Sequence, residues 1–144
     1  MAVPLPQPLP RGNETILLVE PEPETRKLAA FMLTKQGYQV IEARNAADAV
    51  RIFDERTAPI DLLLTEALMS RVNGHDLAQM LEGRSPGLRT LFLADSDYER
   101  LSRKEAAKRG VFFLVRPFTM AILATKVRAT LDAPARSMAA GMRA

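Results

Sequence analysis

Short apolar runs alternate with segments of helical periodicity along the chain, and this alternation constrains the fold more than any other feature. The apolar runs cover residues 15–19, 38–42, 60–65, 90–94 and 111–115, and the helical segments cover residues 24–36, 46–56, 74–82, 97–109 and 119–131. Strands that alternate with helices of this length are typical of βαβ units, in which neighbouring strands run parallel. The pattern therefore predicts a single α/β domain.

The polarity of the runs predicts their order in the sheet. All but the second run are nearly continuously apolar, as expected for strands that helices cover on both faces. The second run, residues 38–41, alternates in polarity and is predicted to be an edge strand. With right-handed crossovers, these features favour a flavodoxin-like (βα)5 doubly wound parallel sheet with strand order 2-1-3-4-5.

Apolar residues at helical spacing predict which helix faces cover the sheet. The predicted faces contain Leu28, Phe31 and Met32 in the first helical segment; Ala46, Ala49, Val50 and Phe53 in the second; and Met120, Leu123, Val127 and Leu131 in the last. Local signals agree with these helices. Pro23 suits a first helical turn, Gly37 a helix end, and Asn45 with Asp48 a capping pair.

Length and composition indicate one domain. A chain of 144 residues with 47% hydrophobic content can bury one sizeable core. Prolines at every second position from Pro4 to Pro10 exclude regular structure there, so residues 1–13 are predicted to be a disordered tail or linker. We expect the domain to span residues 14–132, followed by a flexible tail over residues 133–144.

Several classes of function are disfavoured by composition. The chain has no cysteine, which excludes disulfides, thiolate metal sites and a cysteine nucleophile. Its apolar runs are far shorter than the roughly 20 residues that cross a bilayer, and no signal-peptide pattern is present. Its net charge of +3 is spread among acids rather than gathered into a basic block. We therefore expect a cytoplasmic protein that binds neither membrane nor nucleic acid.

Polar residues that directly follow the predicted strands mark the expected site. In open α/β sheets, the functional crevice lies beyond the carboxyl ends of the strands. The residues at these ends are Glu20, Glu66, Asp95 and Arg116. Carboxylates and a guanidinium brought together there would form either an ion-pair cluster or a weak cation site. Their spacing in the sequence allows both.

Three segments resemble the receiver domain of response regulators in two-component signalling. Residues 15–23, Thr-Ile-Leu-Leu-Val-Glu-Pro-Glu-Pro, are similar to the opening strand that runs into paired acids. Residues 62–74 place an acid at the end of an apolar strand and a glycine eight residues later. Residues 113–118 contain Arg-Pro-Phe, similar to a Lys-Pro-Phe element. The resemblance covers residues 14–131 and implies the flavodoxin-like fold.

The residues at the family's phosphorylation site differ from its pattern. The resemblance implies an Asp phospho-acceptor, an acidic pair that holds magnesium, a Thr or Ser hydroxyl and a Lys. Here the acceptor position is Glu66, whose carboxylate lies roughly 1.5 Å further from the backbone, and the acidic pair is Glu20 and Pro21. Ala94 replaces the hydroxyl and Arg116 replaces the Lys. The resemblance therefore implies a pseudo-receiver.

These changes suggest a hypothesis for the altered pocket. Arg116 would pair with Glu66, and Glu66 would imitate the charge of a phosphorylated acceptor permanently. The alternative is a decayed pocket whose charged residues are solvated. In both cases we expect no cofactor and weak or absent magnesium binding, with Glu20 and Glu66 as the weak candidates for metal ligands.

Three further residues have both a structural and a functional interpretation. Phe113 lies at the position that resembles the family's aromatic switch, although packing also accounts for a phenylalanine there. Pro117 follows the Lys position and is a candidate for a cis peptide bond. His75, the single histidine, is predicted to be a solvated residue near a helix N-terminus.

The sequence therefore predicts a binding module rather than an enzyme: an atypical receiver that acts through protein contacts, with a histidine kinase or another two-component protein as partner. By resemblance, the partner would contact a face formed by strands four and five with residues 97–109 and 119–131, and the same face could form a homodimer.

The alternative function is a phosphoryl-accepting switch that uses Glu66 or a nearby acid such as Asp95. A nucleotide- or flavin-binding enzyme lacks support, because no Gly-rich loop follows the first strand. The proline-rich leader resembles the linker before the C-terminal receiver of hybrid histidine kinases.

Overall fold

The computed structural model describes residues 8–69, 71–95 and 112–134 of the chain. The described strands are β1 (Thr15–Val19), β2 (Gln39–Ala43), β3 (Leu62–Glu66), β4 (Arg89–Ala94) and β5 (Phe112–Val115). The described helices are α1 (Pro23–Lys35), α2 (Ala46–Glu55), α3 (Gly74–Arg84) and α5 (Met120–Asp132). These elements begin and end within a few residues of the predicted boundaries. The predicted helix over residues 97–109 lies outside the described residues.

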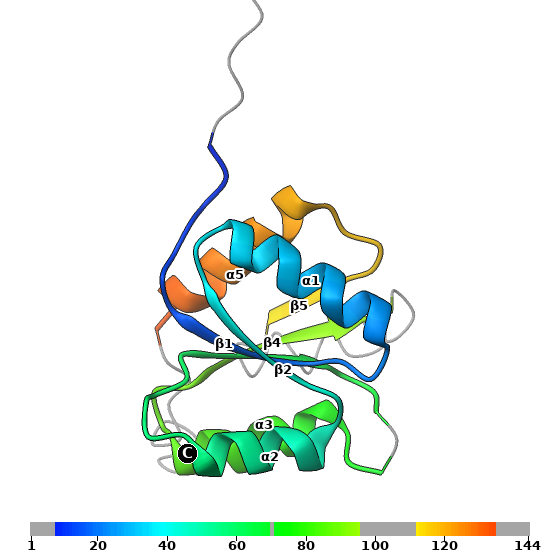
Figure 1. The fold of residues 1–144 in the computed structure, drawn as a ribbon, viewed down its shortest axis with the longest axis vertical. Coiled ribbons are helices and arrows are strands. Elements are labelled where there is room, and N and C mark those ends of the chain that lie inside the picture. Colours follow the sequence, from blue (N-terminus) through cyan, green and yellow to red (C-terminus); the bar gives the residue numbers. More distant parts are fainter. Residues whose placement is uncertain (1–7, 70, 96–111, 135–144) are drawn as a thin grey trace, which may run out of the picture.

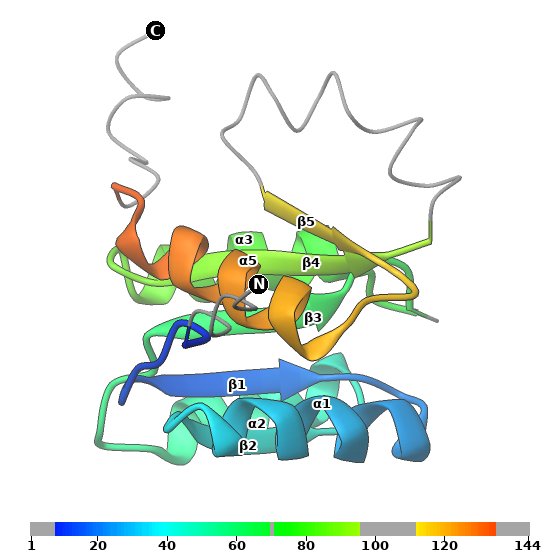
Figure 2. The same ribbon diagram turned by 90° about the horizontal axis from the view of Figure 1, so that it is seen from above.

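All five strands form one parallel sheet in the order β2-β1-β3-β4-β5. The predicted fold class and strand order are confirmed, as are β2 and β5 at the sheet edges. Helices α1 and α5 cover one face of the sheet, and α2 and α3 cover the other (Figure 1). The view from above shows α1 beside β1 and β2, whereas α5 contacts β4 and β5 (Figure 2).

The core has two layers, one on each face of the sheet, because side chains alternate along each strand. Ile16 and Leu18 of β1 point to the layer under α1 and α5, and Leu17 and Val19 point to the layer under α2 and α3. The β1 side chains are buried on both sides. This two-sided burial explains why the strand is a continuous apolar run rather than an alternating one.

One predicted helix face is wrong. The α1 residues Leu28 and Phe31 are 56% and 57% exposed, and only Met32 of the predicted face packs partly against the core. The buried stripe of α1 instead contains Arg26, Ala29, Ala30 and Leu33. The small side chains of Ala29 and Ala30 let the helix approach the sheet closely, which turns the larger Leu28 and Phe31 away from it. The predicted face of α2 is confirmed, and that of α5 is confirmed at Leu123, Val127 and Leu131. Met120 is half-buried and does not belong to either core layer.

Local signals in the sequence position the helix ends. Pro23 begins α1, and Gly37 follows it with a positive φ of 100°. At the start of α2, the Asn45 side chain accepts a hydrogen bond from the Asp48 backbone N–H at 2.8 Å, and the Asp48 carboxylate accepts one from the Arg44 N–H at 3.1 Å. This reciprocal arrangement satisfies backbone donors that the helix leaves free.

The last residues before β1 are attached to the domain. The Gly12 N–H donates to the Gln36 carbonyl at 3.0 Å, and the Arg11 guanidinium donates to the Lys35 carbonyl at 3.2 Å. From α5, Arg128 donates to the Arg11 carbonyl at 3.1 Å. The C-terminal end of the predicted N-terminal tail therefore packs against α1 and α5.

In the part of the chain that the structure describes, no helix combines the length and apolar character needed to cross a bilayer.

Candidate functional site

The carboxyl ends of β1, β3, β4 and β5 meet at one edge of the sheet and bring together residues that lie far apart in the sequence. Parallel pairing aligns Glu66 with Leu93, and Ala94 with Val115, so the residues that follow these positions are neighbours in space. Glu66 is the last residue of β3, one residue beyond the end of the predicted strand, and Ala94 is the last residue of β4, as predicted. The pairing of the strands thus brings the residues of the predicted site together.

Arg116, which directly follows β5, is the centre of an ion-pair cluster. Its Nη1 and Nη2 atoms donate hydrogen bonds to the two carboxylate oxygens of Glu66 at 2.5 and 2.7 Å. Nη2 also donates to Asp95 at 3.2 Å, and Nη1 lies 3.6 Å from a Glu20 oxygen. The predicted contact between Arg116 and Glu66 is confirmed. A bidentate pair of this kind fixes the orientation of both side chains.

Burial distinguishes the carboxylates around Arg116. The residues Glu20 and Glu66 are only 4% and 8% exposed, whereas the Asp95 side chain is 77% exposed. Glu20 and Glu66 are therefore not solvated, and the alternative in which the pocket's charged residues face water is wrong for these two. Three carboxylates contact a single guanidinium, so the cluster keeps an excess of negative charge if all of them ionise.

Glu20 carries the most strongly perturbed carboxyl group of this cluster. Burial, assisted by the hydrogen bond and charge of nearby Glu66, raises the pKa of the Glu20 carboxyl to about 7, against the opposing effects of the Glu22 N–H and the Arg116 charge. The Glu22 N–H donates to a Glu20 oxygen at 3.0 Å. Hydrogen bonding and charge from the carboxylates raise the pKa of Arg116, which therefore stays charged at every physiological pH.

Arg26 positions the backbone of Glu20 and was not identified from the sequence. It is 8% exposed, and its Nη1 atom donates to the Glu20 carbonyl at 2.8 Å while Nε donates to Glu42 at 3.2 Å. Arg26, which belongs to α1, thus fixes the backbone of the connection between β1 and α1. A charged residue in an amphipathic helix normally faces solvent, so periodicity gave no reason to select it.

The other altered positions lack the polar groups of the family pattern. Pro21 is exposed and brings no carboxylate to the site. Ala94 is 1% exposed and packs in the core layer under α2 and α3, so its position offers neither a donor nor an acceptor side chain. Arg116 and Pro117 are joined by a cis peptide bond, as predicted.

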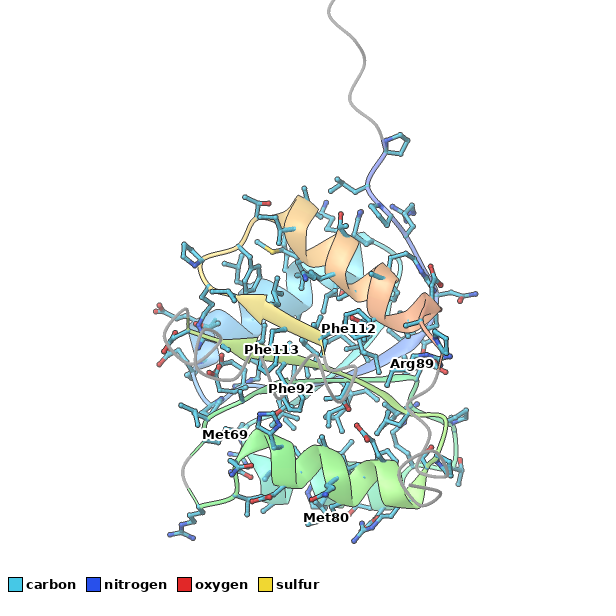
Figure 3. All side chains as sticks on the ribbon, turned by 180° about the vertical axis from the view of Figure 1, so that it is seen from behind. Met69, Met80, Arg89, Phe92, Phe112 and Phe113 are labelled. Carbon is cyan, nitrogen blue, oxygen red and sulfur yellow. The ribbon has the colours of Figure 1, made fainter. Side chains whose placement is uncertain are left out.

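An aromatic cluster lies beside this edge on the face of the sheet that α3 covers. The rings of Phe92 and Phe113, both labelled in Figure 3, have centres 5.6 Å apart. The His75 ring stacks on Phe92, with ring centres 4.3 Å apart. His75 lies in the first turn of α3, as predicted, but its side chain is half-buried rather than fully solvated. The sheet places Phe92 under this turn, so one side of the imidazole packs on an apolar ring.

The residues of the site do not form the ligand set that magnesium prefers. Magnesium requires near-octahedral oxygen coordination, and its protein sites use carboxylates that are free to face the ion. Here the Arg116 guanidinium occupies the oxygens of Glu66 and lies against Glu20. In the described ranges, no group of three or more His, Cys, Asp or Glu side chains has a geometry that could hold a metal ion.

Comparison with known proteins agrees with the fold. The sequence profile of the family described as "Response regulator receiver domain" matches residues 16–128. Response regulator receiver protein CpdR from Brucella abortus (strain 2308) is 30% identical over 118 residues, which cover 82% of this chain and 97% of that protein. Sensor kinase CckA from the same strain is 29% identical over 121 residues, which cover 84% of this chain and 13% of that protein.

A solved structure gives the same result. The crystal structure of the receiver domain from the hybrid histidine kinase CckA is 30% identical, with a TM-score of 0.67, and the match covers 82% of this chain and 99% of that one. The chain therefore spans nearly the whole of CpdR and of the solved CckA receiver domain, but about an eighth of the sensor kinase CckA.

Proposed function

The chain belongs to the family of response regulator receiver domains, which act in two-component signalling, and we propose that in this chain the phosphorylation site is inactive and the domain acts through protein contacts. Receiver domains are generally signalling modules that interact with histidine kinases and other two-component proteins.

The bidentate contact between Arg116 and Glu66 carries the proposal. A phospho-acceptor must present a carboxylate oxygen to the phosphoryl donor, yet both oxygens of Glu66 accept hydrogen bonds from Arg116 at 2.5 and 2.7 Å. The pair thereby places a cation where an incoming phosphoryl group and its magnesium would have to lie. A misplacement of about 1 Å in a positioned reaction can reduce its rate about a hundredfold.

Two further observations support the same conclusion. Magnesium would lose one carboxylate ligand at Pro21 and would compete with Arg116 for Glu20 and Glu66, so we expect its binding to be weak or absent. A phosphoryl group would also find no hydroxyl donor at Ala94, which removes the link between phosphorylation and Phe113. The permanent charge pair would keep the domain in one state.

The partner proposed is a histidine kinase or another two-component protein, in the cytoplasm and without nucleic acid. The similarity to a receiver from a hybrid histidine kinase supports this partner class. The face formed by β4, β5 and α5 is the proposed contact surface, and it would also serve for a homodimer. The predicted helix over residues 97–109, which would complete that face, lies outside the described residues.

The direct test is a titration with magnesium and the phosphoryl analogue beryllofluoride, followed by amide NMR shifts at Glu66, Ala94 and Phe113. The matched control is the chain with Glu66→Asp, Pro21→Asp, Ala94→Thr and Arg116→Lys, which restores the family pattern. We expect shifts in the control only. Saturable shifts at these residues in the native chain would show that its site still binds the analogue and would refute the inactive site.

A second candidate function is a phosphoryl-accepting switch that uses Asp95. The observation that favours it is exposure, because the Asp95 side chain is 77% exposed and accepts a hydrogen bond from Arg116 at 3.2 Å. Incubation with a small acyl phosphate, followed by mass spectrometry of the native chain and of its Asp95→Asn and Glu66→Gln variants, separates the candidates. A phosphoryl adduct that is lost in one variant would identify the acceptor, whereas the inactive site predicts no adduct.

A further inference from the structure

A polar cavity lies at the opposite end of the sheet from the Arg116 cluster. It has a volume of about 190 Å³ and lies between the C-terminal ends of α2 and α3 and the segment that leads into β3. These two helices pack side by side beneath the sheet (Figure 1). The lining residues are Phe53, Arg56, Thr57, Ala58, Pro59, Ile60, Arg84 and Ser85.

The cavity contains hydrogen-bond donors that no other described residue uses. The Nε–H of Arg56 is buried and has no hydrogen-bond partner within the described ranges. A buried donor without a partner typically destabilises a protein by about 1–3 kcal/mol, so such donors usually have a function or a bound partner. The side-chain hydroxyls of Thr57 and Ser85 also line the cavity. All of these groups can donate a hydrogen bond.

The acids near the cavity already have other partners. Asp54 pairs with Arg84 at 2.5 Å, and Glu55 pairs with Arg51 at 3.1 Å. Asp61 accepts a hydrogen bond from the Thr15 N–H at 2.8 Å. The charge of the Arg56 guanidinium is therefore not balanced by any carboxylate in the described part of the chain.

We propose that this cavity binds a small oxyanion, a phosphate or carboxylate group, which Arg56 holds through its guanidinium and which accepts hydrogen bonds from Thr57 and Ser85. The guanidinium presents parallel N–H groups that match two oxygens of such an anion. The volume is also sufficient, because one water in the liquid occupies about 30 Å³ and the cavity could hold several. The inference is independent of the phosphorylation site, which lies at the other end of β3.

The helix ends set a limit on the affinity. Arg56 and Ser85 follow the C-termini of α2 and α3, where the partial negative charge of free carbonyl groups opposes an anion. Binding must therefore depend on the Arg56 guanidinium, and the loss of this one side chain should abolish it. A water molecule would satisfy the same donors without any dependence on anion concentration.

The test is NMR of the full chain with side-chain arginine Nε–H signals resolved. Sodium phosphate and sodium acetate are titrated separately against sodium chloride at constant ionic strength. We expect a saturable shift of the Arg56 Nε–H and of the Thr57 and Ser85 amides. Saturation by phosphate alone or by acetate alone would support the site and identify which of the two anions it takes, and saturation by both would assign it to oxyanions in general.

Matched variants distinguish a specific anion-binding site from a nonspecific effect of positive charge. Arg56→Gln should weaken binding at least tenfold, and Arg56→Lys should weaken it by an intermediate factor, because lysine keeps the charge but loses the paired donors. Arg44→Gln is the control, since the Arg44 side chain is 73% exposed and lies at the other end of α2 from the cavity. Shifts that grow linearly with concentration, or that are equal in Arg56→Gln and Arg44→Gln, would overturn the proposal. Unchanged amide dispersion in each variant shows that the fold is intact.

Discussion

Replacing Glu20 by glutamine should remove most of the pH dependence that this site gives to folding. Burial raises the pKa of the Glu20 carboxyl from an ordinary value of 4.5 to about 7. A carboxyl with a raised pKa binds its proton more tightly in the folded state than in the unfolded state. Its stabilising contribution is therefore fully present below pH 4.5 and is lost as the pH rises through about 7.

The size of the effect follows from the same values. Each pH unit of difference between the folded and unfolded pKa corresponds to about 1.36 kcal/mol, so the free energy of unfolding should fall by up to about 3 kcal/mol over this window. Glutamine is nearly isosteric and uncharged, can still accept from the Glu22 N–H and can donate to Glu66. The Glu20→Gln chain should therefore match the native chain at pH 4.5 and exceed its stability by up to about 3 kcal/mol at pH 8.

Urea unfolding at a series of pH values measures this difference directly. Glu22→Gln is the matched control, because Glu22 is exposed, lies two residues away and contacts Glu20 only through its backbone. The control should follow the native chain at every pH. If the free energies of unfolding of the native chain and of Glu20→Gln differ by the same amount at every pH from 4.5 to 8, the Glu20 carboxyl does not titrate in this range. The charge balance assigned to the site would then be wrong.

Other substitutions test the packing and the ion pair. Gly74→Ala should destabilise the fold by about 2 kcal/mol or more, because a Cβ there would lie 2.2 Å from the Glu66 carbonyl, whereas Gly83→Ala in the same helix meets nothing within 4 Å and should stabilise it by up to about 1 kcal/mol. Thermal unfolding of the two variants measures both effects, and equal melting temperatures would contradict the close approach of α3 to β3. A double-mutant cycle of Arg116→Met and Glu66→Met should give a coupling energy of about 2–3 kcal/mol at pH 8, measured by urea unfolding. Additive effects of these two substitutions would show that the pair contributes no coupling.

The strands were predictable because their signal is local. A strand buried on both faces must be apolar at successive positions, so residues 15–19 could be assigned from their own composition. The order of the strands then followed from handedness and from the polarity of residues 38–41. The ends of α1 could be predicted for the same reason, because Pro23 and Gly37 favour particular conformations of their own backbone.

Helix faces were less predictable, as α1 demonstrates. Leu28, Phe31 and Met32 satisfied the helical spacing, yet the sheet contacts the stripe of Ala29, Ala30 and Leu33. Both stripes have the correct period, and only the shape of the opposing sheet selects between them. The same selection buried Arg26, which the predicted apolar face did not include.

The sequence by itself determined the fold class, the strand order and the positions at the sheet edge where chemistry would be found, because these follow from patterns between near neighbours along the chain. It also identified Glu66 and Arg116, which are 50 residues apart, as candidates for a contact. Only the tertiary structure decided how these groups behave. The raised pKa of Glu20, the stacking of His75 on Phe92 and the unpartnered Nε–H of Arg56 depend on desolvation and on how other elements pack around them. These effects depend on how close two groups lie in space, and residues that are far apart in the sequence can be close in space.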